Sequence, residues 1–405
     1  MTQRRIAVLG GGMLGVCTAL ELSRRGREVT LIEGASEVLE GASRWNEGKI
    51  HLGFLYAADP TLNTATRLIP GGFAFPDLVS RLIGRSVDTF STDDDVFLVH
   101  RHSVVDADSF SAYAQRTADL VRNAASKNRT ARYLTDVSAK VHRLSGSELA
   151  ELTSSDDVVA GFRVPERSVS TVAIADLLRQ VVHDDPRVHV HVDTWVREMR
   201  RHEDGRLDII TSARNAGAFD RFDVVINALW EGRPAVDATL GIVPPAPWSH
   251  RFRAGVFGRA EETSLPSAVL CTGPFGDVKR YRDGRFYLSW YEAGLLAEGD
   301  EIDPPRDAAE LTPERQARVM RGTLDALSNF FPATRELRRD AQELEVRGGW
   351  VYAIGSGPLA DRASTLHRRD KFGMTVDRGY ISVDTAKYSL APWLGARVAQ
   401  IAVDA

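Results

Sequence analysis

Three glycines near the start of the chain have the spacing that a bound dinucleotide requires. Gly10, Gly12 and Gly15 follow a short apolar run that is typical of a buried parallel strand. The first glycine permits a tight turn, the second lets the backbone approach a pyrophosphate, and the third lets a helix pack closely on a strand. The helix predicted to begin with Met13 and Leu14 directs its N-terminus at the phosphate charge. This pattern predicts a nucleotide-binding unit at the start of the chain.

An acidic residue ends the second strand of this unit. Residues 28–33 form the second predicted strand, which ends on Glu33, and Gly34 follows it. A carboxylate about 20 residues beyond the glycines accepts hydrogen bonds from ribose hydroxyls and disfavours a 2′-phosphate. The glycines and Glu33 together predict a dinucleotide site, but they leave NAD and FAD as alternatives.

The segment 41–53 distinguishes the two cofactors. It resembles the loop that the D-amino-acid oxidase superfamily of flavoproteins places against the pyrophosphate, ribityl chain and isoalloxazine ring of FAD. The resemblance therefore implies non-covalently bound FAD. The cofactor contacts that it implies in this segment are Ala42, Ser43, Arg44, Asn46, Gly48, Lys49 and Ile50.

Part of this segment resembles one branch of the superfamily in particular. The run Ile50-His51-x-Gly53, followed by Tyr56, is similar to the glycerol-3-phosphate dehydrogenase and L-2-hydroxyglutarate oxidase branch. Residues 348–351 lack the Arg-Pro pair that the glycerol-3-phosphate enzymes carry there, which argues against glycerol 3-phosphate as the substrate.

Two strands in the middle of the chain also resemble the superfamily. Val196 opens one of them and corresponds to a residue whose backbone contacts adenine, and Asn227 closes the buried run 222–228 beside the cofactor. The family usually continues with Ala-Gly, whereas this chain has Leu229 and Trp230. We expect Trp230 to cover the cofactor.

The C-terminal segment resembles the family's last strand, loop and helix. The resemblance implies cofactor contacts from Ala386, Lys387 and Tyr388, ahead of a helix predicted over residues 390–403. Lys387 matches the lysine of a Gly-Gly-Lys loop, although Thr385 and Ala386 replace the glycines. Positive charge there would face the flavin N1 and C2 carbonyl, where negative charge collects on reduction. The alternative is an exposed lysine that caps the helix.

Four residues are candidates for catalysis or substrate binding, and each has a structural alternative. His51 is a proton acceptor near the flavin or a histidine bonded to backbone. Arg369 clamps an anionic substrate group, pairs with Asp370, or belongs to a solvated run of charges. Tyr291 lines a pocket or is an ordinary sheet residue. Lys387 contacts the flavin or the substrate.

The remaining pattern predicts an α/β and α+β fold with a Rossmann-type FAD-binding domain and a mainly antiparallel substrate domain. We expect the first from residues 1–80, 150–232 and 345–405, and the second from 81–149 and 233–344. Within the latter, a hairpin is predicted to turn at Asp283-Gly284. Alternation puts Phe286, Leu288 and Trp290 on one face of its second strand and Tyr287, Ser289 and Tyr291 on the other. A helix is predicted from Thr312-Pro313 to about residue 330.

Composition excludes several other classes of protein. The formal net charge is −4, with 51 basic and 55 acidic residues and no basic block, so nucleic acid is not an expected partner. No apolar run approaches the roughly 20 residues that a membrane span needs. Cys17 and Cys271 have the spacing of neither a metal site nor a disulfide framework, so a reducing cytoplasm and no metal are expected.

These observations predict an FAD-dependent oxidase or dehydrogenase. It would transfer hydride from a CH–NH or CH–OH carbon of a small polar substrate to flavin N5, with dioxygen or another acceptor reoxidising the flavin. The alternatives are a flavin monooxygenase, for which no second glycine motif for NADPH is present, and a flavin-binding protein that has lost catalysis. The substrate, the electron acceptor and the oligomeric state are left open.

Overall fold

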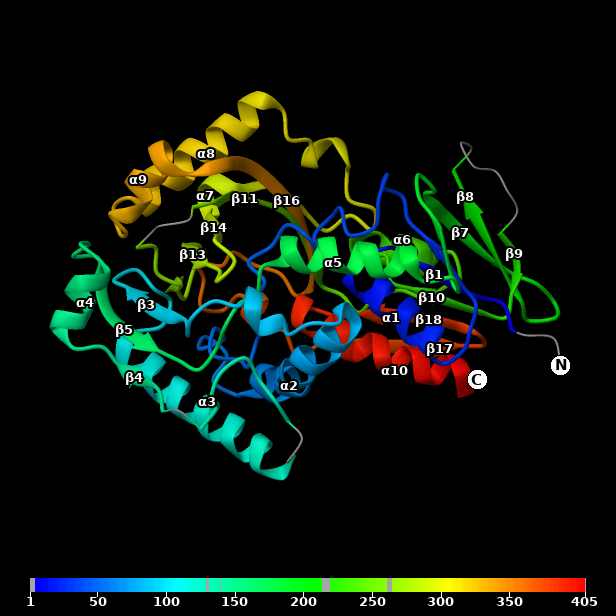
Figure 1. Cartoon of the computed structure of the whole chain (residues 1–405), viewed down its shortest axis with the longest axis horizontal. Helices are drawn as coiled ribbons and strands as arrows, with labels where there is room; N and C mark the ends of the chain where they lie inside the picture. The colour runs from blue at the N-terminus through cyan, green and yellow to red at the C-terminus, as the bar shows by residue number, and fades with distance from the viewer. Residues whose placement is uncertain (1–3, 129–130, 139, 213–218, 261–263, 405) are drawn as a thin grey trace.

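The computed structural model describes residues 4–128, 131–138, 140–212, 219–260 and 264–404. Two large sheets organise the chain, and a small third sheet lies beside the first of them (Figure 1). This arrangement confirms the predicted α/β and α+β fold class.

The first sheet is six-stranded and carries the glycine motif. Its order is β17-β18-β10-β1-β2-β6, and its pairs are parallel except for the antiparallel pair of β17 and β18 at one edge. Its strands are β1 (Ile6–Leu9), β2 (Val29–Ile32), β6 (Val188–His191), β10 (Val224–Asn227), β17 (Gly373–Asp377) and β18 (Tyr380–Asp384).

Both faces of this sheet are covered, which explains why its central strands are mostly apolar. Ile6 and Val8 of β1 pack into a core that α1 (Met13–Arg24), α5 (Thr171–Asp184) and α10 (Ala391–Asp404) share. Ala7 and Leu9 face the opposite core. That core is completed by the three-stranded sheet, which consists of β7 (Val196–Arg201), β8 (Leu207–Thr211) and β9 (Phe219–Phe222).

The second large sheet is nine-stranded and mainly antiparallel. Its path is β15-β11-β14-β13-β12-β3-β5-β4, and β16 pairs with β11 off this path. Its strands are β3 (Val96–His100), β4 (His142–Arg143), β5 (Val158–Arg163), β11 (Trp248–Arg259), β12 (Ala268–Cys271), β13 (Gly276–Arg280), β14 (Arg285–Trp290), β15 (Leu295–Gly299) and β16 (Gln342–Ile354). One face of this sheet packs against a helix, and the other is free to line a cavity.

The remaining helices surround the two sheets. They are α2 (Asn63–Ile83), α3 (Ala107–Lys127), α4 (Gly146–Leu152), α6 (Arg233–Ala238), α7 (Tyr291–Gly294), α8 (Pro313–Leu327) and α9 (Ala333–Asp340). Helix α8 contacts β11, β14 and β16 of the nine-stranded sheet, and Thr312 caps it by accepting a hydrogen bond from the amide of Arg315, as its Thr-Pro start predicts. In Figure 1, α8 and α9 lie above the strands of this sheet, and α3 lies below them.

The predicted alternation along β14 is confirmed. Phe286 and Leu288 belong to the core shared with α8, whereas Tyr287, Ser289 and Tyr291 line a cavity.

The predicted hairpin forms, but its turn lies one residue earlier in the chain than the prediction placed it. The turn spans Tyr281–Gly284, with Arg282 and Asp283 as its central residues, and the Gly284 amide donates to the Tyr281 carbonyl at 3.1 Å. Gly284 has a φ of 83° and occupies the left-handed position after the turn, as in three-residue hairpin loops.

Two strands from the segments predicted for the FAD-binding domain lie in the second large sheet instead. Strands β5 and β16 both lie in the nine-stranded sheet, although the segments 150–232 and 345–405 contain them in whole or in part. The domain boundaries stay a prediction. Within the described ranges, no helix is long and apolar enough to cross a membrane, and no group of three or more His, Cys, Asp or Glu residues has the arrangement of a metal site.

The packing of α1 on β1 gives a direct test of the fold. A Cβ atom at Gly15 would lie 1.8 Å from the Gly10 carbonyl oxygen, so α1 must shift to admit it. We expect Gly15→Ala to lower stability by about 1–3 kcal/mol, the usual effect of overpacking. The measurement is the thermal unfolding midpoint.

Gly146→Ala is the matched control, because a Cβ at this first residue of α4 meets no heavy atom within 4 Å. Equal midpoints for the two variants would contradict the close approach of α1 to β1.

Candidate active site

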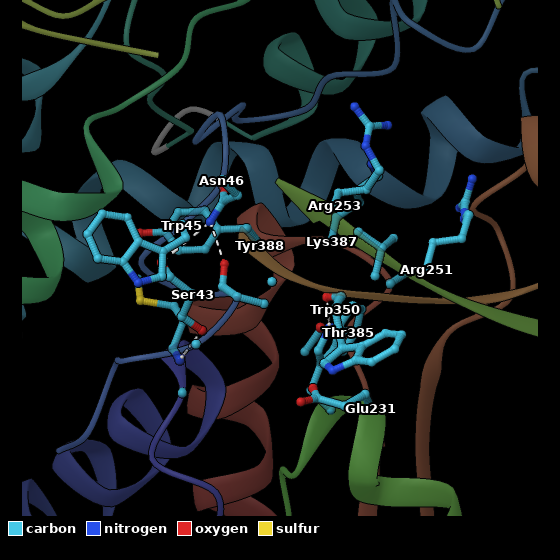
Figure 2. Close-up of a pocket in the computed structure, with 18 of the residues that line it drawn as sticks. Ser43, Trp45, Asn46, Glu231, Arg251, Arg253, Trp350, Thr385, Lys387 and Tyr388 are labelled. Atoms are coloured by element: carbon cyan, nitrogen blue, oxygen red, sulfur yellow. Dashed lines mark hydrogen bonds between the residues drawn. The ribbon is translucent and has the colours of Figure 1, made fainter. Parts of the chain in front are cut away.

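One cavity of about 760 Å³ joins the glycine motif to the inner face of the nine-stranded sheet. At one end it is lined by Gly10, Gly12 and Glu33, which follow the carboxyl ends of β1 and β2. At the other end it is lined by side chains of β11 and β14. Figure 2 shows Ser43 and Asn46 toward one side of the drawn region and Arg251 and Arg253 toward the other. A ligand in this cavity can therefore touch both sheets.

The nucleotide end has the geometry that the glycine motif predicts. Gly10 has a φ of 93°, and a Cβ there would lie 2.7 Å from the Ala228 carbonyl oxygen. A Cβ at Gly12 would meet only Ser43 Oγ, at 3.0 Å, among the described atoms within 4 Å. The space in front of Gly12 thus belongs to the cavity, where a pyrophosphate would approach the backbone.

Glu33 is tied to the backbone of the motif. Its carboxylate accepts hydrogen bonds from the amides of Gly11 at 2.6 Å and Ala35 at 2.8 Å. Burial raises the pKa of this carboxyl, while these amides act in the opposite direction. Glu33 lines the cavity together with Gly34 and Val196.

The loop after β2 is held in shape by its own side chains. Ser43 Oγ accepts a hydrogen bond from the amide of Met13 at 2.8 Å, which links the loop to the start of α1. Asn46 donates to the Ala42 carbonyl at 2.8 Å and accepts from the Gly48 amide at 2.8 Å. Gly48 has a φ of 63°, and a Cβ there would lie 1.8 Å from the Val169 carbonyl oxygen. Glycine is therefore required at this position by the protein itself.

Two positions at which this chain replaces the family's glycines adopt the backbone conformation that glycine favours. Trp230 has a φ of 56°, and its indole donates to the Trp350 carbonyl at 2.7 Å. Ala386 has a φ of 52°, and its amide donates to Asp384 at 2.9 Å. Both residues line the cavity. Neighbouring contacts hold these non-glycine residues in a conformation that disfavours a Cβ atom.

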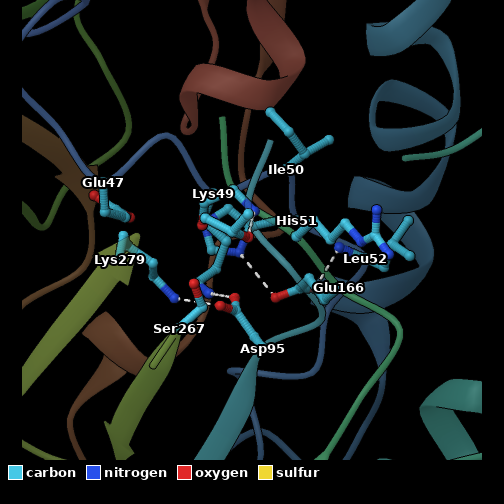
Figure 3. Close-up of polar contacts among 12 residues, drawn as sticks. Glu47, Lys49, Ile50, His51, Leu52, Asp95, Glu166, Ser267 and Lys279 are labelled. Carbon is cyan, nitrogen blue, oxygen red and sulfur yellow. Dashed lines mark hydrogen bonds and ion pairs between the residues drawn. The ribbon is translucent and has the colours of Figure 1, made fainter. Parts of the chain in front are cut away.

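His51 is buried against a second titratable group. Only 1% of it is exposed, and its Nδ1 lies 3.9 Å from Glu166 Oε1, with neither atom in a hydrogen bond (Figure 3). Burial and the nearby charge of Lys387 and other cations hold the pKa of His51 well below 6.5, so its imidazole is neutral at pH 7. Glu166 itself accepts from the amides of Leu52 at 2.6 Å and Gly53 at 3.1 Å.

A buried ion cluster lies next to His51. Lys49 and Lys279 both contact the carboxylate of Asp95, with Lys279 Nζ at 2.5 Å from Oδ1 (Figure 3). Burial lowers the pKa of Lys279 to about 8. Burial also opposes the charge on Lys49, but the carboxylates of Asp95 and Glu166 outweigh it and raise its pKa. Sequence reasoning missed Asp95 and Lys279, because no local pattern marks them.

Three arginines and Lys387 line the end of the cavity opposite the glycine motif. Arg251 donates to the Tyr291 hydroxyl at 3.1 Å, and the guanidinium of Arg253 lies 4.0 Å from the centroid of the Tyr291 ring. Arg369 donates to the Leu366 carbonyl at 2.7 Å. Burial and the charge of Arg369 lower the pKa of Lys387 to about 8. Arg251 and Arg253 were also missed, although two arginines at a spacing of two on one strand are a signal for a shared face.

Most of the predicted site residues lie on this cavity. They are Gly10, Gly12, Met13, Leu14, Glu33, Gly34, Ala42, Ser43, Asn46, Lys49, His51, Val196, Tyr291, Arg369, Ala386, Lys387 and Tyr388. Arg44, Gly48, Ile50 and Asn227 do not line it.

Each of these four has another place in the structure. The Arg44 side chain pairs with Asp176, and Ile50 is buried in the helix-side core. Gly48 shapes its loop, as described above. Asn227 is in register with Leu9, and its amide donates to Asp237 at 2.9 Å on the opposite side of the sheet from α1. Asp370 pairs with Arg368 rather than with Arg369.

The left-handed residue at the end of β18 gives a stability test. Replacing Ala386 by glycine removes a Cβ from a disfavoured backbone conformation, and we expect stability to rise by about 0.5–1 kcal/mol. The thermal unfolding midpoint measures it. As a control of opposite sign, Ala125→Gly within α3 should lower the midpoint. A lower midpoint for Ala386→Gly would show that residue 386 does not have a positive φ.

The comparisons with known proteins agree with this geometry. Glycine oxidase from Geobacillus kaustophilus superposes with a TM-score of 0.70 at 14% identity, covering 100% of this chain and 95% of its own. Iminodiacetate oxidase from a Chelativorans species gives 0.68 at 17% identity, with coverages of 99% and 95%. The FAD-bound L-α-glycerophosphate oxidase from Mycoplasma pneumoniae gives 0.62 at 15% identity, with coverages of 100% and 96%. These structures share the fold.

No curated protein matches the sequence of this chain. The model of the family described as DAO, FAD dependent oxidoreductase, matches residues 5–401. The glycine motif, Glu33 and the open space in front of Gly12 suit the cofactor of that family. The protein therefore belongs to the DAO family of FAD-dependent oxidoreductases.

Proposed function

We propose that this enzyme oxidises a small polar substrate at a CH–NH or CH–OH carbon, with dioxygen or another acceptor as the final oxidant. One observation carries the proposal. The cavity that begins at the nucleotide-binding glycines ends among a neutral histidine, a lysine and three arginines. FAD, when bound, accepts the hydride of the donor and passes its electrons on.

His51 suits the role of proton acceptor. Oxidation of an alcohol or amine releases a proton from oxygen or nitrogen as the hydride leaves carbon, and a neutral imidazole can take it. The low pKa of His51 keeps the imidazole unprotonated over the physiological pH range. A carboxyl oxygen of Glu166 lies 3.9 Å from Nδ1, where its negative charge would stabilise the imidazolium after proton transfer.

Lys387 and Tyr56 lie close to His51 in the cavity. The ammonium of Lys387 lies 5.9 Å from the centroid of the Tyr56 ring, and the His51 and Tyr56 rings are 5.5 Å apart. A cation at this point stabilises negative charge that develops on the cofactor during oxidation of the donor. Lys387 therefore supplies a positive charge that is already in place before the donor binds.

The reaction class is testable without knowledge of the natural substrate. The FAD-loaded protein is mixed anaerobically with panels of amino acids, N-methyl amines, 2-hydroxy acids and amino sugars, and its flavin absorbance is followed. Bleaching by an amine or alcohol donor supports the proposal. Bleaching by NADPH alone would indicate a monooxygenase, and no bleaching by any donor would favour a non-catalytic flavin-binding role.

Replacement of His51 by asparagine tests the proton acceptor. The variant should keep FAD but reduce it about 100-fold or more slowly with the donor found above, because general-base catalysis usually contributes that much. Stopped-flow absorbance under anaerobic conditions measures the rate. His183→Asn, which removes a histidine paired with Glu37 outside the cavity, is the control. An unchanged rate in the His51 variant would remove this role.

The pH dependence of donor oxidation tests Lys387. Its pKa of about 8 means that it is charged below this pH and becomes neutral as the pH rises through 8. The rate of flavin reduction at saturating donor should therefore contain a step that falls as the pH rises through 8. His51, with its lowered pKa, should add no step between pH 8 and 6.5.

In Lys387→Met, the step near pH 8 should be absent and the rate at pH 7 lower. A profile identical to that of the unaltered enzyme would show that Lys387 does not act on the reaction.

A further inference from the structure

The arginines at the sheet end of the cavity have no acidic partners. Among the described residues, no carboxylate oxygen lies within 4.0 Å of a nitrogen of Arg251, Arg253 or Arg369 in an ion pair. The Nε atom of each of the three is buried without a hydrogen bond. Glu47 and Asp277 also line the cavity, but neither pairs with these arginines. The cavity thus presents several donor groups that the protein leaves unsatisfied.

Two of the three guanidinium groups come from one strand and are held by one aromatic residue. Arg251 and Arg253 are two residues apart on β11, so both side chains leave the same face of the sheet. Tyr291 fixes both, because its hydroxyl accepts from Arg251 and its ring lies beneath Arg253. Opposite Arg253, β16 carries Gly349, which packs against Ala42 of the loop after β2. The two arginines are therefore oriented before any ligand binds.

The third guanidinium approaches from a different part of the chain. Arg369 lies before β17, and its Nη1 is anchored by the carbonyls of Leu366 at 2.7 Å and Arg368 at 2.8 Å. Only 8% of this residue is exposed. Arg369 and Arg251 line the same cavity, and burial and the charge of Arg251 lower the pKa of Arg369 to about 10.

Buried guanidinium groups without counter-ions are unfavourable unless a ligand supplies the charge. One carboxylate can pair bidentately with one guanidinium or bridge two, and it would leave the third unsatisfied. We propose that the substrate carries two anionic groups, one bound between Arg251 and Arg369 and the other by Arg253. The substrate class is thus a small dicarboxylate or a carboxylate with a phosphate-like group. This inference rests on the proposed function, because it assigns the donor that this site oxidises.

The test compares ligands that differ only in the second anionic group. Butyrate, succinate and 3-phosphonopropionate are titrated into the oxidised, FAD-loaded protein by isothermal titration calorimetry at constant ionic strength, because screening would otherwise differ between them. None of them has to react, so the result does not depend on turnover. We expect at least one of the two dianions to bind about tenfold or more tightly than butyrate, the effect of one further charge-assisted pair.

The ligand with the highest affinity identifies the chemistry of the second anionic group. Preference for succinate indicates a dicarboxylate, and preference for 3-phosphonopropionate indicates a phosphate-like group. Equal affinities for all three, or no binding of any, would overturn the proposal while leaving the oxidation of a monoanionic or neutral donor untouched. Conversely, tight dianion binding without flavin reduction by any donor would leave the site intact and contradict the proposed function.

Arg253→Met assigns the second subsite. It should weaken the preferred dianion about tenfold and change butyrate binding by less than about twofold. Arg259→Met, which removes an exposed charge from the same strand, should change neither affinity. An equal loss for butyrate and the dianion in Arg253→Met would contradict the assignment of two separate anion sites. Because the ligand comparison uses the unaltered protein, it stands even where a variant fails to fold.

Discussion

The buried carboxylate of Asp95 is the contact on which the site's arrangement depends. It lies just before β3, and it pairs with Lys49 of the nucleotide-binding loop and with Lys279 of β13. These three segments belong to different parts of the chain, so the ion cluster joins the cofactor loop to the substrate-facing sheet. Removing one partner of a buried pair usually costs about 3–5 kcal/mol, because the remaining charge loses its compensation. The position of His51, two residues after Lys49, follows from this anchor.

An excess of positive charge around the cavity links cofactor chemistry to substrate choice. Burial lowers the pKa of His51, and the charges of Lys387, Lys49 and Arg369 act in the same direction, so the imidazole is neutral. Burial and the charge of Arg369 lower the pKa of Lys387. Positive charge at this end of the cavity would stabilise a reduced flavin and would attract an anionic donor. The proposed proton acceptor, the proposed fixed cation and the proposed anion-binding arginines thus share one electrostatic environment.

Local patterns in the sequence predicted the elements well. The glycine motif, Glu33, the alternation along β14 and the capped start of α8 all involve residues close together in the chain, where backbone sterics and side-chain periodicity dictate the result. The resemblance to the family led from a dinucleotide to FAD. The turn of the β13–β14 hairpin was misplaced because Gly284 acts after the turn rather than within it.

Long-range pairing was beyond the reach of local patterns. Asp95 is 46 residues from Lys49 and 184 from Lys279, and nothing in either neighbourhood marks the partner. Asn227 was predicted to lie beside the cofactor; its side chain donates to Asp237, and the residue does not line the cavity. Trp230 and Ala386 replace glycines that the resemblance implies, and both have the positive φ that glycine favours.

The central claim is that the flavin lies between the nucleotide-binding glycines and the cluster of His51, Lys387 and the arginines. A crystal structure of the FAD-loaded enzyme tests it most directly. The account predicts the pyrophosphate over Gly12 and the isoalloxazine ring in contact with both His51 and Lys387. An isoalloxazine ring that lies outside this cavity, or that touches neither residue, would contradict it.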